Sequence, residues 1–73
     1  MTNADVFRII LAEASNRPVE EIEELYVAFS RDFGIPRHDD EMPDEEAEEL
    51  LASLREELPG IKAWAAKAGG RGR

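Results

Sequence analysis

Apolar side chains recur at three- and four-residue intervals along most of the chain, which is the spacing of amphipathic helices. The first stripe predicts a helix over about residues 3–15, which Thr2 or Asn3 can cap while Asp5 places a carboxylate in the positive first turn. Its apolar members are Val6, Phe7, Ile10, Leu11 and Ala14. Asn16 follows the stripe and suits a left-handed C-cap.

A second stripe predicts a helix over about residues 18–33. Pro18 can begin it, because the first helical position needs no backbone N–H. Its apolar members are Val19, Ile22, Leu25, Tyr26, Phe29 and Phe33. Gly34 is placed to end this helix in a left-handed conformation, and Pro36 prevents simple continuation.

The third stripe predicts a helix over about residues 43–58. Pro43 again stands at the start, and acidic residues 44–46 fill the first turn, where the helix dipole stabilises them. Its apolar members are Ala47, Leu50, Leu51, Leu54 and Leu58. The Pro59–Gly60 pair predicts an end or a sharp bend.

A fourth, short helical segment is expected at about residues 60–68, with Gly69 ending it. Its apolar members are Ile61, Trp64, Ala65 and Ala68. No convincing alternation of apolar and polar residues predicts a strand. We therefore expect an all-α fold: a small three-helix bundle with a short fourth segment, forming one domain over residues 1–68. The basic tail, residues 69–73, is expected to be disordered.

Charge changes this picture by restricting the partners. The 73 residues include seventeen acids and nine bases, for a net charge of −8, and the last fourteen residues hold four of the bases and no acid. The acidic body should repel nucleic acid and anionic membranes, and only the short basic tail could contact either, so we expect neither direct nucleic-acid binding nor membrane association. No apolar run reaches the ~18–20 residues of a membrane-spanning helix.

The composition also argues against catalysis and metal binding. There is no cysteine, which excludes disulfides and thiolate chemistry and fits a cytoplasmic location. His38 is the only histidine, so no transition-metal ligand set can be completed around it, and the order of a calcium loop is absent. The serines have no local base, and no glycine-rich phosphate loop occurs. We expect no enzyme activity, cofactor or metal.

The densest feature is an acidic run in which eight of the eleven residues 39–49 are Asp or Glu. Residues 44–49 can be explained as the solvated start of a helix. Asp39, Asp40 and Glu41 precede that helix and have no such explanation. A basic partner surface would be attracted to this run, and salt would weaken the attraction.

The aromatic residues suggest a second contact. Phe7, Phe29 and Phe33 are expected in the core, whereas Tyr26 and Trp64 each carry a polar atom that favours an edge. An exposed apolar patch, if there is one, is expected around Leu58, Ile61 and Trp64; the alternative is that these residues close the core. The predicted partner-binding residues are Asp39, Asp40, Glu41, Asp44, Glu45, Glu48 and Trp64.

Two fragments resemble acyl carrier proteins. The stretch VFRIILAEASNRPVEEI is similar to that family's first helix and turn, and EMPDEEAEEL to its later acidic segment. The family's Asp-Ser-Leu motif, whose serine carries the phosphopantetheine arm, has no counterpart here, because Ser30 stands between Phe29 and Arg31. No functional residue is therefore carried over.

Three functional readings follow from the sequence. The first is a non-enzymatic interaction or regulatory module that docks a protein with a basic surface. The second is an acidic inhibitor or antitoxin-like mimic of nucleic acid, of the kind that occurs among phage and mobile-element accessory proteins. The third is a structural homodimer whose helices pair to complete a thin core.

Overall fold

The computed structural model describes residues 1–35 and 41–70, and within them the fold is all-α, as predicted. It comprises a 3₁₀ turn and four α-helices: α1 (Asn3–Ser15), η1 (Val19–Glu21), α2 (Glu23–Phe33), α3 (Asp44–Glu56) and α4 (Leu58–Gly70). No strand forms in this part of the chain, where the only β-type contact is an isolated bridge between Thr2 and Glu41.

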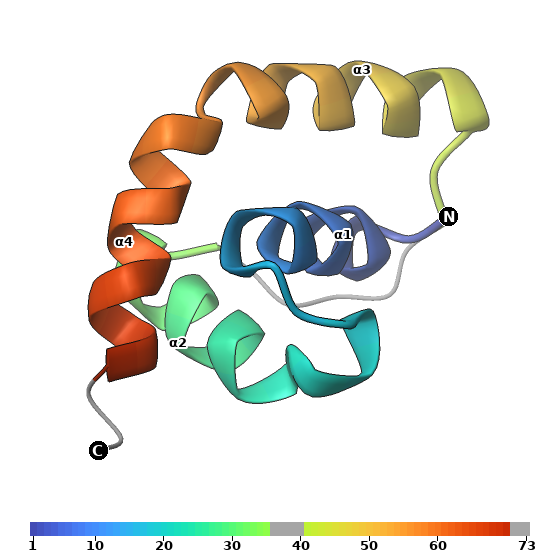
Figure 1. Ribbon diagram of the computed structural model, residues 1–73. Coiled ribbons are helices and arrows are strands. Elements are labelled where there is room, and N and C mark those ends of the chain that lie inside the picture. Colours follow the sequence, from blue (N-terminus) through green and yellow to red (C-terminus); the bar gives the residue numbers. More distant parts are fainter. Residues whose placement is uncertain (36–40, 71–73) are drawn as a thin grey trace.

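Helix α1 is the centre of the molecule. In Figure 1, α3 crosses on one side of α1, α2 lies on the other, and α4 runs across one end. Helix α1 packs against every other element and most extensively against α4, whereas α2 and α3 do not approach each other. The other helices are therefore held in place mainly through α1.

The sequence places the ends of α1 correctly. Thr2 caps the helix: its hydroxyl accepts a hydrogen bond from the Asp5 amide at 3.1 Å, and its own amide donates to the Asp5 carboxylate at 3.1 Å. This reciprocal pair satisfies two backbone donors that would otherwise lack partners. At the other end Asn16 takes the left-handed conformation, with φ of 57°.

The predicted helix over residues 18–33 is divided in two. Residues Val19–Glu21 form a 3₁₀ turn, and α2 begins only at Glu23. Val19, the first residue of this 3₁₀ turn, is 48% exposed. Ile22, at the junction, is fully buried instead. Gly34 ends α2 with φ of 64°, as predicted.

The boundary between the third and fourth helices differs from the prediction. Helix α3 ends at Glu56, and α4 begins at Leu58 and is as long as α3, at 13 residues. Pro59 prevents continuation because its ring clashes with the carbonyl four residues earlier, yet it fits the first turn of the next helix. Helix α4 also extends through Gly70, so the first two residues of the predicted tail are helical. Residues 71–73 lie outside the described part.

A short pairing anchors the start of α3 beside the start of α1. The Met42 amide donates to the Met1 carbonyl at 3.1 Å, next to the Thr2–Glu41 bridge. Pro43 then occupies the N-cap position of α3, with φ of −58° and ψ of 150° and no side-chain capping hydrogen bond. Residues 41–43 therefore set the direction in which α3 crosses α1.

The core lies between α1 and its neighbours. The fully buried large side chains are Val6, Ile10, Leu11 and Ile22. Two aromatic predictions are wrong. Tyr26 lies in the core, only 2% exposed, with the Arg8 guanidinium over its ring, 5.1 Å from the ring centroid. Phe33 is 54% exposed, because it is the last residue of α2 and only the side facing Phe29 and Trp64 is covered.

Candidate protein-docking surface

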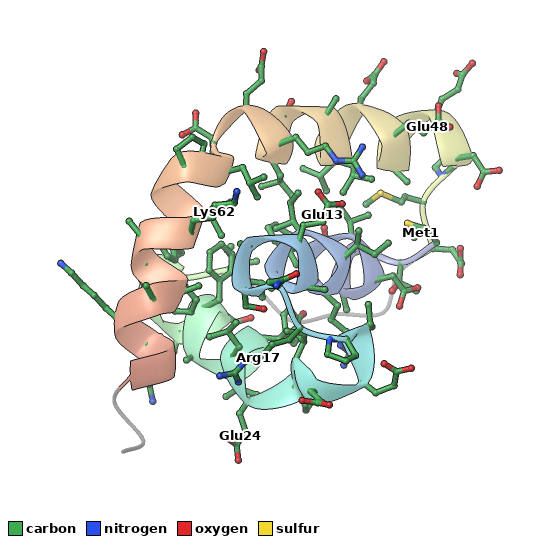
Figure 2. All side chains as sticks on the ribbon, viewed as in Figure 1. Met1, Glu13, Arg17, Glu24, Glu48 and Lys62 are labelled. Atoms are coloured by element: carbon green, nitrogen blue, oxygen red, sulfur yellow. The ribbon has the colours of Figure 1, made fainter. Side chains whose placement is uncertain are left out.

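The outer side of α3 is a continuous acidic face. We use the name acidic face for the exposed carboxylates of Asp44, Glu45, Glu46, Glu48, Glu49, Glu56 and Glu57. In Figure 2, carboxylates project from α3 on the side away from α1. Within the described residues, none of these seven carboxylates forms an ion pair.

The single base on α3 does not neutralise this face, because it bonds to α1. Arg55 donates two hydrogen bonds to Glu13, from Nε at 3.2 Å and from a terminal nitrogen at 2.8 Å. The Arg55 hydrogen bond holds the pKa of the Glu13 carboxyl below its ordinary value. The one positive charge of α3 is therefore used to join helices.

Only some of the predicted partner-binding residues lie on the acidic face. Asp39 and Asp40 lie outside the described residues. Glu41 is exposed, and its carboxylate is 2.7 Å from the terminal ammonium of Met1, so it is already paired. The remaining carboxylates of the prediction, Asp44, Glu45 and Glu48, lie exposed on the acidic face.

Trp64 is not brought to the acidic face. It lies half-buried on α4, and its indole N–H donates to the Asp32 carboxylate at 2.9 Å. Its ring stacks edge-on against Phe29 and Phe33 of α2, with centroid distances of 5.1 and 5.9 Å. Trp64 therefore closes the α2–α4 contact, and its polar atom already has a partner.

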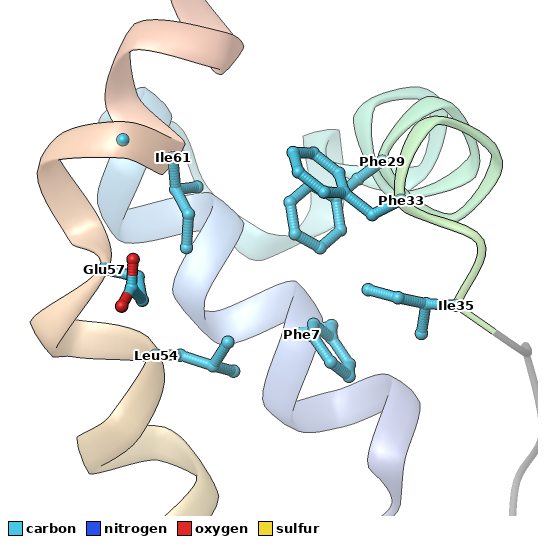
Figure 3. A pocket seen from close by; sticks show the side chains of 8 residues that line it. Phe7, Phe29, Phe33, Ile35, Leu54, Glu57 and Ile61 are labelled. Carbon is cyan, nitrogen blue, oxygen red and sulfur yellow. The ribbon is translucent and has the colours of Figure 1, made fainter.

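An apolar groove lies between the end of α2 and the α3–α4 junction. Its volume is about 510 Å³. Its lining comprises Phe7, Phe29, Phe33, Ile35, Leu54, Glu57, Gly60 and Ile61. Figure 3 shows Phe29 and Phe33 on one side, Leu54 and Ile61 on the other, and Phe7 between them. We call this feature the α2–α4 groove.

The α2–α4 groove borders the acidic face. Glu57 belongs to both, and helical register places Glu46 and Glu49 on the same edge of α3, eleven and eight residues before it. Arg55 reaches Glu13 from the opposite edge. The edge of α3 beside the groove thus carries three carboxylates and no base.

Sequence reasoning missed the exposed aromatic residue of this groove. The sequence left two alternatives for Leu58, Ile61 and Trp64, an exposed patch or closure of the core; Ile61 is only 6% exposed and the other two are half-buried against the core, so the second holds. Ile61 also lines the groove. The available signal for Phe33 was its place directly before the helix-ending Gly34.

The shifted carboxyl groups have structural causes. The pKa of Asp5 lies below its ordinary value mainly because the carboxylate accepts the Thr2 backbone N–H, as part of the helix cap. The pKa of Glu13 is lowered by Arg55, as described above. Across the described ranges, no three Asp, Glu or His side chains converge as a metal site would require.

No family model, curated protein or solved structure is detectably similar to this chain. In residues 1–35 and 41–70, no helix combines the length and the apolar character that crossing a bilayer requires. The acidic face and the α2–α4 groove are therefore interpreted from their own geometry and charge.

Proposed function

We propose that this chain is a non-enzymatic interaction module that docks a partner protein with a basic surface through the acidic face of α3. The observation that carries the proposal is the set of seven exposed carboxylates, six on α3 and Glu57 directly after it, that make no ion pair among the described residues, while the only base of α3 is bound to Glu13. Such a face creates a local negative potential that nothing on its own helix offsets.

The physical effect of this face is collective. A single exposed ion pair contributes only about 0–1 kcal/mol, because water and salt screen it. Many like charges on one face act together, since they steer an oppositely charged partner and raise its association rate. Binding should therefore survive the loss of one carboxylate, weaken when several are removed, and decrease as salt rises.

The test is a pull-down from native lysate with two triple variants that change the net charge equally. One variant replaces Glu45, Glu48 and Glu49 of the acidic face with Gln. The matched control replaces the exposed Glu20, Glu21 and Glu24 of η1 and α2. The captured proteins are eluted with rising salt, with and without prior nuclease treatment, and are quantified by mass spectrometry.

The proposal predicts a protein partner that survives nuclease treatment, elutes as salt rises and is lost from the acidic-face variant but retained by the control. Equal loss from both variants would contradict it, because net charge alone would then explain the binding. A partner that added DNA or RNA displaces would instead indicate the nucleic-acid mimic. Specific recovery of only this chain would indicate the homodimer.

A further inference from the structure

We propose that the α2–α4 groove binds the apolar side of an amphipathic helix of the partner, whose flank carries Lys or Arg beside the acidic edge of α3. This inference rests on the proposed function, and it names the apolar half of the interface and the form of the segment that fills it.

The lining of the groove favours an apolar occupant. Seven of its eight lining residues are apolar or glycine. Phe33, which forms one wall of the groove, is 54% exposed. Phe29 and Ile61, 4% and 6% exposed, connect the groove directly to the core. An inserted apolar side chain would therefore extend a packed aromatic cluster and cover Phe33.

The charges beside the groove favour a basic occupant. Glu57 lines the groove itself, and Glu46 and Glu49 continue along the same edge of α3. A helix with an apolar stripe and a basic flank would meet apolar side chains and carboxylates side by side. Helices recognised in grooves use apolar anchors one turn apart, which fits a groove between helices.

The same charges argue against the other occupants. A second copy of this chain would bring its own acidic edge against the first, and the chain has a net charge of −8. A small ligand would find one polar side chain, Glu57, to fix its orientation, whereas small-molecule sites usually offer several. A basic, amphipathic segment is the occupant that satisfies both halves of the surface.

The chain contains a natural reporter for this site. Trp64 is its only tryptophan, and its ring contacts Phe33, which lines the groove. Filling the groove should change the surroundings of both rings. Binding can therefore be followed by Trp64 fluorescence, with a probe that contains no tryptophan.

The probe is an Ala-based peptide of about four helical turns, ~14 residues, that carries Leu at three positions one turn apart and Lys on one flank. A second peptide has Glu in place of Lys, and a third has the first composition in scrambled order. Each is titrated into the full chain at low and at high salt, and the oligomeric state is measured by sedimentation.

Gly60 allows the groove to be filled without disrupting the fold. No atom lies within 4 Å of the position that a Cβ would take there, and the residue lies in the first turn of α4. Gly60→Leu should therefore fold and place a side chain in the groove, since Leu is a better helix former than Gly. Ala66→Leu, at an exposed position on the same helix, is the matched control.

The expected result is saturable binding of the Lys peptide, weakened about tenfold or more by Gly60→Leu, by the scrambled order and by the Glu exchange, but not by Ala66→Leu.

Absence of binding by the Lys peptide would overturn the inference. Equal binding to both Leu variants would also overturn it, but would leave the proposed function standing. Equal binding of Lys and Glu peptides would place an apolar helix in the groove and contradict the proposed function. Self-association that Gly60→Leu removes would make a second copy the occupant.

Discussion

Three polar side-chain atoms lie buried against the core without a hydrogen-bond partner in the described part of the chain: Arg8 Nε, the Tyr26 hydroxyl and the Ser30 hydroxyl. Tyr26 and Ser30 are one helical turn apart on α2. A buried donor that forms no hydrogen bond costs about 1–3 kcal/mol relative to the same group in water. These atoms therefore lower the stability of an otherwise apolar α1–α2 contact.

Replacing Tyr26 with Phe should raise the free energy of unfolding by about 1 kcal/mol, because it removes the hydroxyl and keeps the ring under Arg8. Urea unfolding followed by circular dichroism measures this change. Tyr26→Leu is the control, because it loses the ring as well and should destabilise the fold. A lower stability of the Phe variant would show that the hydroxyl has a partner, such as bound water.

Sequence reasoning was least reliable in predicting which individual side chains are buried. Tyr26 and Phe33 belong to the same apolar stripe, and the polar atom of Tyr suggested that it would take the edge. The structure reverses them. Position along α2 decides the outcome: Tyr26, in the first turn, is covered by Arg8 of α1, whereas Phe33 is the last residue of the helix and is covered only in part.

At the scale of elements, α1 and α3 are connected by the two hydrogen bonds between Arg55 and Glu13. Their effect depends on pH. Since the folded state lowers the pKa of Glu13, this carboxylate stabilises the fold fully above its ordinary pKa of 4.5. That contribution is lost as pH falls from there through the lower pKa of the folded state.

Glu13→Gln should therefore lower the thermal midpoint slightly at neutral pH, because the interaction is at the surface. The difference from the natural chain should shrink below pH 4.5 and disappear once Glu13 is protonated in the folded state. Differential scanning calorimetry across this range tests it. Glu24→Gln, at an exposed position without an ion pair among the described residues, is the control that changes the net charge equally. A deficit that persists at low pH would contradict the assignment.

The elements themselves were largely predictable. The range of α1, its Thr2 cap and the left-handed Asn16 and Gly34 all follow from local chemistry that acts over one helical turn. The helix boundaries near Pro18 and Pro59 were less predictable. Proline excludes some helical positions but fits several early ones, so the sequence marks a break without fixing its register.

For the whole molecule, the limiting quantity is the size of the core. Among the described residues only four large side chains are fully buried, and the chain has no cysteine to form a disulfide. Domains of this length are expected to have about 4–11 kcal/mol of stability, at ~0.05–0.15 kcal/mol per residue. A single core defect should therefore remove a large part of it.

Ile10, fully buried on the central helix, is the sharpest place to test this. Ile10→Val should cost about 0.5–1.5 kcal/mol and Ile10→Ala about 2–5 kcal/mol, because the second leaves a larger cavity. Chemical unfolding of both variants measures the difference. Exposed Val27, 37% accessible, serves as the control, since Val27→Ala should change stability little. A mild effect of Ile10→Ala would mean that the core collapses around the cavity.

The candidate site was predictable only in part at this scale. The acidic run is visible in the sequence, and α3 displays five of its eight carboxylates. The α2–α4 groove was not predictable, because Phe7, Phe33 and Leu54 come from three helices and meet only through the packing around α1. The separation of Trp64 from the acidic face has the same origin, since it depends on the direction in which α4 leaves α3.

The central position of α1 has a consequence for synthesis. Of the four helices, α1 is made first, yet the helix against which it packs most extensively, α4, is made last. While a ribosome produces the intervening segments, the apolar stripe of α1 can be covered only in part, by α2 and then by α3. The core closes only when Ile61 and Ala65 have left the exit tunnel, so native packing of the domain is completed after translation of nearly all of it.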